Sequence, residues 1–256
     1  MRLIVCGVLG RMGKVTQELI DASEDKNVVA GVDSCTDSVH FPLYKTIKEC
    51  KTKADCVISF LPPTASYENI ALLDYCSQKQ LPVVICTTGL CDNVKRKINE
   101  ASQRTAVLHS ANMSIGINLI NSVLEKVSKS LFDAGFDIEI VEKHHSGKID
   151  SPSGTAVMLA STINTALDGK MDIVFDRSRE QKKRKQNELG VFALRGGGIC
   201  GDHSVMFAST TEVIEFSHQA LSRRVFANGA IKAAEFLQKK EPGLYTMKNL
   251  FASINK

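Results

Sequence analysis

Several features of common protein classes are missing from these 256 residues. No apolar run reaches 18 residues, so we expect no membrane-spanning helix and no membrane partner. The first seven residues, MRLIVCG, are typical of a strand and lack the basic and long apolar regions of a secretory signal. None of the eight cysteines forms a CxxC pair, and the ligand spacings of a zinc site are absent. We therefore predict a cytoplasmic protein whose thiols stay reduced.

The charges are nearly balanced, which bounds the choice of partners. The formal net charge is +4, too small for the dense basic patch of a nucleic-acid-binding protein, so we expect no nucleic-acid partner. A hydrophobic content of 43% is that of an ordinary globular protein, and the length favours two domains.

The first apolar run ends in a glycine-rich turn, GVLGRMG at residues 7–13, and a helical pattern follows. This order is the context of a dinucleotide-binding loop. There Gly7 permits a tight turn, Gly10 lets the backbone approach a pyrophosphate, and Gly13 allows close helix packing. Arg11 and the first helix amides add attraction for phosphates.

A second apolar run, residues 28–32, ends at Asp33, twenty residues past Gly13. An acid at this distance binds the adenosine ribose hydroxyls. Ser34 follows it, where an arginine would accept a 2′-phosphate, so the sequence slightly favours NADH. A lysine from elsewhere could still meet that phosphate and allow NADPH. A solvated turn acid is the alternative interpretation of Asp33.

Strands and helices continue to alternate through the first half. Further strands are expected at 54–61, 82–86 and 106–109, with helices at 67–79 and 92–103. The alternation predicts an α/β fold with a Rossmann-like doubly wound parallel sheet, which binds ligands outside the carboxyl ends of its strands. The loops at those ends carry Thr87, Thr88, Gly89 and Asn112, which we expect to line the cofactor cleft. Both threonines could equally be ordinary turn residues.

The second half has a different order of helices and strands. A long helix over 116–131 leads to a strand at 136–141, and strands at 190–194, 201–209 and 212–218 follow without intervening helices. This predicts a second, α+β domain with an open mixed sheet. Residues 176–185, DRSREQKKRK, contain six basic residues, and the default interpretation is a solvated loop. A mobile flap over an anionic site is the alternative.

The chemically densest stretch is 139–156, EIVEKHHSGKIDSPSGTA. His144 and His145 follow a strand and should point to opposite sides, and histidine is the natural proton donor near neutral pH. Lys148 supplies positive charge or a second proton source. A metal site is the alternative, although adjacent histidines on a strand are not a chelating pair.

The same stretch ends in a helix start. Ser151 is expected to be the N-cap, with Pro152 at the first helical position. Ser153, Gly154 and Thr155 would then lie in the first turn, whose amides suit a carboxylate or phosphate. A plain capped helix is the alternative. A proton donor, a cation and an anion-binding helix start together indicate an enzyme that acts on a small anionic substrate.

These motifs resemble the 4-hydroxy-tetrahydrodipicolinate reductase family, also called dihydrodipicolinate reductase, of the bacterial and plant lysine and diaminopimelate pathway. The resemblance follows the family's order over nearly the whole chain and rests on six segments: 7–13, 87–89, 112–118, 142–156, 201–203 and 222–229. It implies a dinucleotide-binding domain of residues 1–114 and 224–256. It also implies a substrate-binding and oligomerisation domain of 115–223, a homotetramer, and reduction of a cyclic imine dicarboxylate by NADH or NADPH.

Matched by position, the resemblance implies roles for particular residues. His144 would be the general acid and Lys148 its catalytic partner. Substrate contacts would come from His145, Lys148, Ser153, Gly154, Thr155 and Arg223. Cofactor contacts would come from Gly7, Gly10, Arg11, Met12, Gly13, Asp33, Thr87, Thr88, Gly89, Asn112 and Met113.

The chain departs from the family pattern at three places. Cys86 replaces the first glycine of a Gly-Thr-Thr-Gly loop, Met113 replaces an aromatic residue, and the basic loop 177–185 is dissimilar. Two other functions fit parts of the sequence. A different two-domain dehydrogenase would explain the first half but not residues 144–155. A sensor that binds dinucleotide and dicarboxylate would not need His144.

Overall fold

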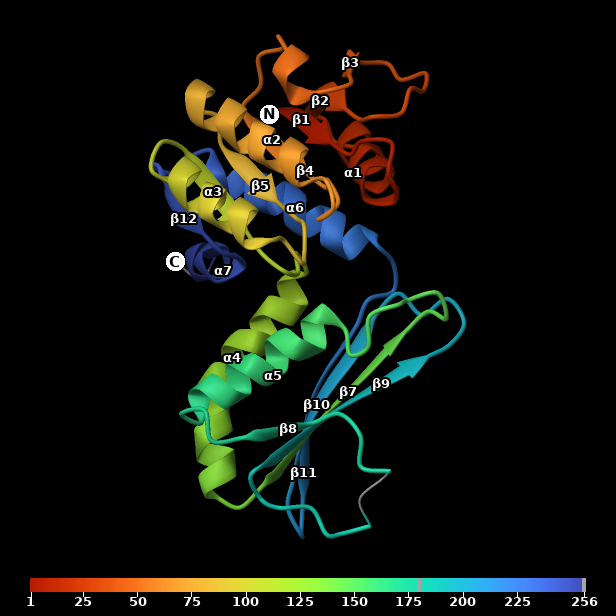
Figure 1. The fold of residues 1–256 in the computed structure, drawn as a ribbon, viewed down its shortest axis with the longest axis vertical. Coiled ribbons are helices and arrows are strands. Elements are labelled where there is room, and N and C mark those ends of the chain that lie inside the picture. Colours follow the sequence, from red (N-terminus) through yellow and green to blue (C-terminus); the bar gives the residue numbers. More distant parts are fainter. Residues whose placement is uncertain (179–180, 255–256) are drawn as a thin grey trace. The chain divides into compact units, whose positions relative to one another are not determined.

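A computed structural model describes residues 1–178 and 181–254 of the chain. The described residues form two compact units (Figure 1). Unit 1 consists of Met1–Ile115 and the segment that begins at Arg223, and unit 2 consists of Gly116–Ser222. The division falls within one residue of the predicted boundaries, and the roles predicted for the two domains stay predictions.

Unit 1 is built on a seven-stranded sheet in which neighbouring strands are parallel. The strand order is β12-β6-β5-β4-β1-β2-β3. The strands are β1 (Arg2–Cys6), β2 (Asn27–Val32), β3 (Leu43–Tyr44), β4 (Cys56–Ser59), β5 (Val83–Ile85), β6 (Ala106–His109) and β12 (Gly243–Tyr245). The order reverses at β1, so the loop after β1 opens at the switch point where such sheets bind nucleotides. The prediction of a doubly wound parallel sheet is confirmed.

Helices cover both faces of this sheet because successive strand residues point to opposite sides. Leu3 and Val5 pack with helices α1 (Arg11–Asp21), α6 (Arg224–Leu237) and α7 (Met247–Ile254). On the opposite face, Ile4 and Cys6 pack with α2 (Ser66–Lys79) and α3 (Asp92–Ser102). A short 3-10 helix, η1 (Ile47–Glu49), adjoins α2. The central strands are therefore buried on both sides, and they read as continuous apolar runs.

Unit 2 contains a five-stranded mixed sheet in the order β11-β10-β7-β9-β8, as predicted. Its strands are β7 (Asp137–His144), β8 (Asp172–Val174), β9 (Glu188–Arg195), β10 (Asp202–Ala208) and β11 (Val213–Gln219). β10 pairs antiparallel with β7 and β11, whereas β7, β9 and β8 are parallel.

Two helices pack on one face of this sheet (Figure 1). They are α4 (Ile115–Asp133) and α5 (Gly154–Ala166), and they bury Ile138 and Ile140 of β7. Glu142 and His144 follow on the same face by alternation and are also buried. Core packing of β7 therefore carries two polar side chains to the end of the strand.

Two sequence predictions need correction. The N-cap of α5 is Ser153, not Ser151, because Ser153 Oγ accepts the amide hydrogen of Ala156 at 3.2 Å. The backbone N–H of Ser153 donates to buried Glu142, which keeps Ser153 just outside the helix. Pro152 therefore precedes the N-cap and does not occupy the first helical turn.

The basic loop is only partly solvated, because Lys182, Lys183 and Lys185 are exposed whereas two of its arginines bind carboxylates of the sheet. Arg177 donates to Glu139 at 2.8 Å and to Glu188 at 2.5 Å, and Arg184 pairs with Asp137 and Glu139. These carboxylates lie on β7 and β9. Glu139 and Glu188 are largely buried there, and a buried carboxylate needs a cationic partner. Residues 179 and 180 of the predicted loop lie outside the described residues.

Candidate active site and cofactor site

The glycine-rich turn of unit 1 has the close packing that a dinucleotide-binding loop requires. Gly7 has a φ of 71°, and its N–H donates to Val32 O at 2.8 Å. A Cβ added at Gly13 would lie 2.2 Å from Gly7 O and 2.4 Å from Val8 O. Only glycine at position 13 lets α1 begin directly against the turn.

The carboxylate of Asp33 lies beside this turn. One oxygen accepts the N–H of Leu9 at 3.0 Å, and the other accepts the N–H of Cys35 at 3.1 Å. Each carboxylate oxygen has a second lone pair, so Asp33 can also accept ribose hydroxyls. These two bonds also fit an ordinary turn acid, so the ribose contact of Asp33 stays a prediction.

Two further strands of the sheet end in polar loops. The Thr87 hydroxyl is buried and donates to Leu61 O at 2.6 Å, while Thr88 and Gly89 are exposed. Asn112 is also buried, and its Oδ1 accepts the Ser114 N–H at 2.7 Å. The Met113 side chain is 4% exposed and belongs to the core of unit 1, so a cofactor contact there would come from the backbone.

These residues fit a dinucleotide. The exposed Gly10 and Arg11 at the start of α1 offer amides and a guanidinium to phosphates. Asp33 follows β2 and offers a ribose acceptor at the same carboxyl edge of the sheet as the loops after β5 and β6, which carry Thr88 and Asn112. The fit supports the predicted cofactor contacts, which stay predictions residue by residue.

In unit 2, Glu142 is the organising side chain of the candidate active site. Its side chain is completely buried, and its two oxygens accept four hydrogen bonds. Oε2 receives His144 Nδ1 at 2.6 Å and one Arg195 nitrogen at 2.8 Å. Oε1 receives the other Arg195 nitrogen at 2.7 Å and the Ser153 N–H at 2.9 Å. Strands β7 and β9 and the start of α5 therefore meet at one carboxylate.

The hydroxyl of Ser153 connects this cluster to β10. His203 Nε2 lies 3.0 Å from Ser153 Oγ, and the His203 ring packs edge-on against His144 with centroids 5.2 Å apart. Among the described residues, His203 Nδ1 is buried without a hydrogen-bond partner. Ser153 is thus fixed from both sides before α5 begins.

Lys148, the cation of the motif, forms its hydrogen bonds within its own loop. Lys148 Nζ donates to Asp150 at 2.7 Å, and the Lys148 N–H donates to His145 O at 3.1 Å. Arg195 reaches the same loop through Asp150 O at 2.7 Å. His145 is half-buried beyond the end of β7, and Gly154 is exposed at the first position of α5. The structure thus places His144, His145, Lys148 and Ser153 in one continuous hydrogen-bonded segment.

Burial and neighbouring charges shift the pKa values in this cluster. Burial alone would raise the pKa of Glu142, but the bonds from Arg195, His144 and Ser153 outweigh it and lower the pKa. Burial lowers the pKa of His144, although the Glu142 bond opposes this. Burial and the nearby His144 lower the pKa of His203 to about 4. Both imidazoles therefore lose a proton more readily than a free histidine, whereas Glu142 keeps its negative charge.

Sequence reasoning missed the roles of Glu142, Arg195 and His203. Glu142 could have been found, because it precedes His144 by two residues on a strand and so shares its face. Arg195 and His203 come from β9 and β10, more than fifty residues away, and only sheet pairing reveals them. Arg223 lies immediately before α6 in unit 1, and its role in substrate binding stays a prediction.

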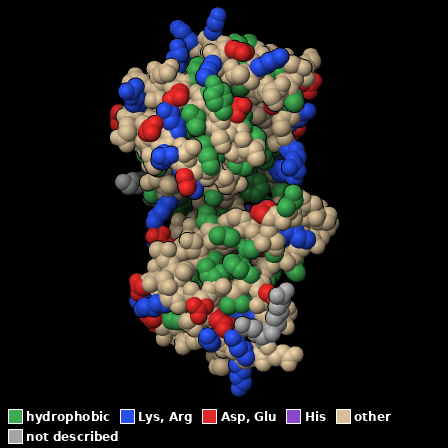
Figure 2. Space-filling view, in the orientation of Figure 1, with side chains coloured by type: hydrophobic (Ala, Val, Ile, Leu, Met, Phe, Trp, Pro, Cys, Tyr) green, Lys and Arg blue, Asp and Glu red, His purple; other side chains and the backbone are tan. Residues whose placement is uncertain are grey.

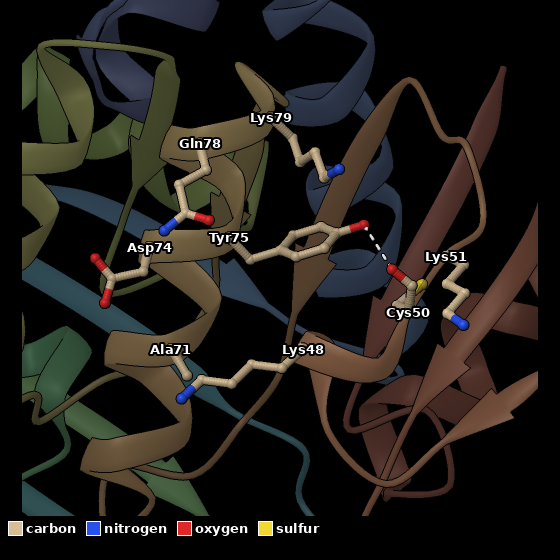
Figure 3. A pocket seen from close by; sticks show the side chains of 8 residues that line it. All are labelled: Lys48, Cys50, Lys51, Ala71, Asp74, Tyr75, Gln78 and Lys79. Carbon is tan, nitrogen blue, oxygen red and sulfur yellow. Dashed lines mark hydrogen bonds between the residues drawn. The ribbon is translucent and has the colours of Figure 1, made fainter.

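A separate cavity of about 520 Å³ lies in unit 1, between η1 and α2. Figure 3 shows Tyr75 across its middle, with the Tyr75 hydroxyl donating to Cys50 O at 3.2 Å. The remaining lining residues are Lys48, Lys51, Ala71, Asp74, Gln78 and Lys79. None of these is a predicted site residue.

Metal-binding clusters and membrane-spanning helices are both absent from the described residues, 1–178 and 181–254. No group of three His, Cys, Asp or Glu side chains there is placed to hold a metal ion. Nor does any helix in those ranges have the length and hydropathy to cross a membrane. On the face drawn in Figure 2, Lys and Arg side chains alternate with Asp and Glu.

Comparisons with known proteins cover nearly the whole chain. Residues 1–113 match the family described as "Dihydrodipicolinate reductase, N-terminus", and residues 116–251 match "Dihydrodipicolinate reductase, C-terminus". The 4-hydroxy-tetrahydrodipicolinate reductase of Clostridium novyi is 46% identical over 99% of both chains. That of Caldanaerobacter subterraneus is 47% identical over 98% of both.

The fold also matches a solved structure. Dihydrodipicolinate reductase from Paenisporosarcina, solved with dipicolinate bound, aligns with a TM-score of 0.78 at 20% identity, over 97% of this chain and 98% of that one. At this identity the likeness concerns the fold.

Proposed function

The chain belongs to the dihydrodipicolinate reductase family, and we propose on that premise that His144, Lys148 and the start of α5 form its active site. The protein is an oxidoreductase that reduces 4-hydroxy-tetrahydrodipicolinate to tetrahydrodipicolinate with NADH or NADPH, in lysine and diaminopimelate biosynthesis. Family membership over the whole chain excludes an amino-acid or sugar dehydrogenase. It also makes the protein an enzyme and not a sensor.

One observation carries the site assignment. His144 is 8% exposed, its Nδ1 is bound to Glu142, and Glu142 also binds the N-cap of α5. A proton-transfer side chain and a helix start are thereby held together by one buried carboxylate, and Lys148 lies in the loop between them. Core packing alone requires none of these groups.

The chemistry explains what these residues do. The substrate's hydroxyl group leaves as water, and reduction then adds a hydride and a proton to the unsaturated ring. The nicotinamide, when bound, supplies the hydride. His144, as the imidazolium, donates the proton from Nε2 and keeps the hydrogen on Nδ1, which is bound to Glu142. Lys148 stabilises the negative charge that develops on the ring.

The substrate carboxylates bind to the residues around the start of α5. Ser153, Gly154 and Thr155 begin this helix, where amide groups carry partial positive charge. His145 and Lys148 add donors from the preceding loop, and Arg223 completes the set. The two carboxylates of the substrate explain why several cationic and amide groups gather in one segment.

NADH is the preferred cofactor in this proposal. The Asp33 carboxylate accepts the Leu9 N–H beside the turn, where it would bind ribose hydroxyls and repel a 2′-phosphate. Ser34 adds no positive charge that would offset this repulsion.

We further propose a cytoplasmic homotetramer assembled through the open face of the unit 2 sheet. Val141, Phe192 and Met206 alternate with buried residues and so point away from α4 and α5. Leu194 and Val213, on the same face, are 54% and 58% exposed. Exposed apolar side chains gathered on one sheet face mark an interaction surface. Light scattering on the purified protein measures the subunit number.

A coupled assay tests the proposed active site. Pyruvate and aspartate semialdehyde generate the substrate enzymatically, and oxidation of NADH or NADPH is followed. We expect oxidation by the wild type and a loss in turnover of about 10²–10⁴-fold for His144→Gln, the range for general acid catalysis. Lys143→Gln, the exposed neighbour on β7, should keep full activity. An unchanged rate for His144→Gln would remove His144 from this role.

A further inference from the structure

Glu142 and Arg195 form a two-point ion pair inside unit 2. The two terminal nitrogens of Arg195 lie 2.7 and 2.8 Å from the two oxygens of Glu142. Glu142 is completely buried, and the Arg195 side chain is 19% exposed. The remaining acceptor positions of Glu142 receive His144 Nδ1 and Ser153 N–H.

We propose that the Glu142–Arg195 pair is a positioning unit, which holds His144 in the tautomer and orientation that leave Nε2 as its proton-exchanging nitrogen. This inference rests on the proposed role of His144 as the general acid. It adds two residues to the machinery of the reaction, neither of which needs to touch the substrate.

The first argument is the charge state of Glu142. An ionised carboxylate is an acceptor only, so the nitrogen that contacts it must carry the hydrogen. Arg195 remains protonated and donates to both oxygens, which keeps Glu142 ionised although it is buried. The hydrogen of His144 is consequently fixed on Nδ1, and Nε2 is left to take up and release the catalytic proton.

The second argument is the shape around Nε2. A Cβ added at Gly201 would lie 3.0 Å from His144 Nε2 and 3.4 Å from Cδ2. Glycine at position 201, directly before β10, therefore avoids a close contact with the nitrogen that the proposal makes reactive. His203 meets the ring edge-on at an interplanar angle of 76°. The imidazole is thus restrained at Nδ1 and on its side, while Nε2 has room.

The third argument concerns the charged groups that face His144. They are Glu142 on β7, Arg195 on β9, Lys148 in the following loop and His203 on β10. The charges of Glu142 and Arg195 nearly cancel, so the pair orients the ring without locking it as an imidazolium. A general acid must be able to lose its proton, and a pair of net charge near zero permits this.

The same pair also orders the loop that carries Lys148. Arg195 donates to Asp150 O at 2.7 Å, and Asp150 accepts from Lys148 at 2.7 Å. A purely structural role for the ion pair is the competing explanation, because it links β7, β9 and α5. The test must therefore read the state of the imidazole as well as stability.

The test uses protein labelled with ¹⁵N-histidine and compares wild type with Glu142→Gln. The His144 signals are assigned by their loss in His144→Gln, and the Nδ1 and Nε2 shifts are followed from pH 5 to 9. We expect the wild-type ring to be protonated at Nδ1 at high pH. In Glu142→Gln a substantial Nε2–H population should appear, because a glutamine amide can donate to Nδ1.

Kinetics supply the second readout. Glu142→Gln should lower kcat on the order of 10²-fold or more, as expected for a misoriented proton donor, with KM changed less than threefold. The pH profile of kcat should also move to lower pH, because the imidazolium loses an anionic neighbour. Glu142→Asp and Arg195→Lys, which keep the charges, should recover part of the rate.

Glu139→Gln is the matched control. Glu139 is a carboxylate on the same strand that is bound by two arginines, Arg177 and Arg184. It should cost stability yet leave the His144 tautomer and the pH profile unchanged. If Glu142→Gln behaves like this control in both readouts, the positioning role is overturned.

A second variant covers the case in which Glu142→Gln does not fold. Gly201→Ala leaves the ion pair intact but places a methyl carbon 3.0 Å from His144 Nε2. It should lower kcat by at least tenfold with little change in melting temperature, and full activity would overturn the proposal. The proposed function fails separately. It is contradicted if the wild type does not oxidise NADH or NADPH in the coupled assay, or if His144→Gln keeps its turnover, while the ¹⁵N shifts still show His144 protonated at Nδ1.

Discussion

The hydroxyl of Ser153 lies 3.0 Å from Nε2 of His203, fifty residues further along the chain. This contact joins the N-cap of α5 to β10 and places a neutral histidine against the candidate active site. Its consequences can be measured, as can those of four other features of the molecule.

The first prediction concerns stability at low pH. His203 has a pKa of about 4 in the folded protein, lowered by burial and by His144. The unfolded chain binds its proton near pH 6.5, so stability is full above that pH and falls as the pH drops from 6.5 towards 4. The full difference corresponds to about 3 kcal/mol. Urea unfolding followed by circular dichroism at several pH values measures it.

The control for this titration is a non-titrating replacement. His203→Asn should flatten part of the pH dependence between 6.5 and 4, whereas His40→Asn, at an exposed position in unit 1, should not. An unaltered slope in His203→Asn would show that His203 is not the titrating group.

The second prediction separates charge from carboxylate binding. Lys148→Ala removes the ammonium that stabilises charge on the ring, so it should mainly depress kcat. Thr155→Val removes a hydroxyl from the first turn of α5 and should mainly raise the KM for substrate. Steady-state kinetics in the coupled assay distinguish the two. The reverse pattern would exchange the proposed roles.

The third prediction concerns cofactor choice. Asp33→Ser should raise the KM for NADH by roughly tenfold or more, the cost of losing a hydrogen bond to a charged group. The KM for NADPH should change less or fall, because a negative charge near the 2′-phosphate is removed. Asp37→Ser, an exposed acid four residues later, is the matched control. Equal changes for both cofactors would contradict the ribose assignment.

The fourth prediction uses the packing of the glycine turn. Gly13→Ala places a methyl group 2.2 Å from Gly7 O, which forces α1 away from β1. We expect a loss of about 1–3 kcal/mol in stability, the usual cost of overpacking, together with weaker NADH binding. Gly198→Ala has open space around the new methyl group and should change neither quantity. Fluorescence titration with NADH and thermal unfolding provide the two measurements.

The fifth prediction tests the loop 176–185. Arg177 and Arg184 bind carboxylates near the start of β7, whereas His144 lies at its end. Arg177→Gln and Arg184→Gln should therefore lower the stability of unit 2 by about 1–3 kcal/mol, because each leaves a half-buried carboxylate without its full complement of donors. Turnover should stay within twofold, as in Lys183→Gln. A large loss of turnover would favour the flap interpretation.

Local sequence determined much of this protein. The alternation of apolar runs with helical patterns identified the doubly wound sheet, because burial of a strand on both faces leaves a continuous apolar signal. Glycines at 7, 10 and 13 marked the turn, since close backbone approach excludes other residues. The adjacency of His144, Lys148 and Ser153 marked the candidate active site before any fold was known.

Other features had no local signal. The edge strands β3, β8 and β12 are two or three residues long, and they are strands only because a neighbour offers hydrogen bonds. The sequence predicts the N-cap of α5 two residues early, because Ser151 and Ser153 are equally good caps by type. Ser153 is the N-cap because its N–H donates to Glu142 and so lies outside the helix.

Tertiary structure also decided which polar residues work together. The sequence alone predicts His144 as the proton donor but cannot show what fixes its ring. Pairing of β7 with β9 and β10 brings Arg195 and His203 to Glu142, His144 and Ser153. A buried carboxylate requires partners from several strands, since one strand can offer only the side chains on its own face.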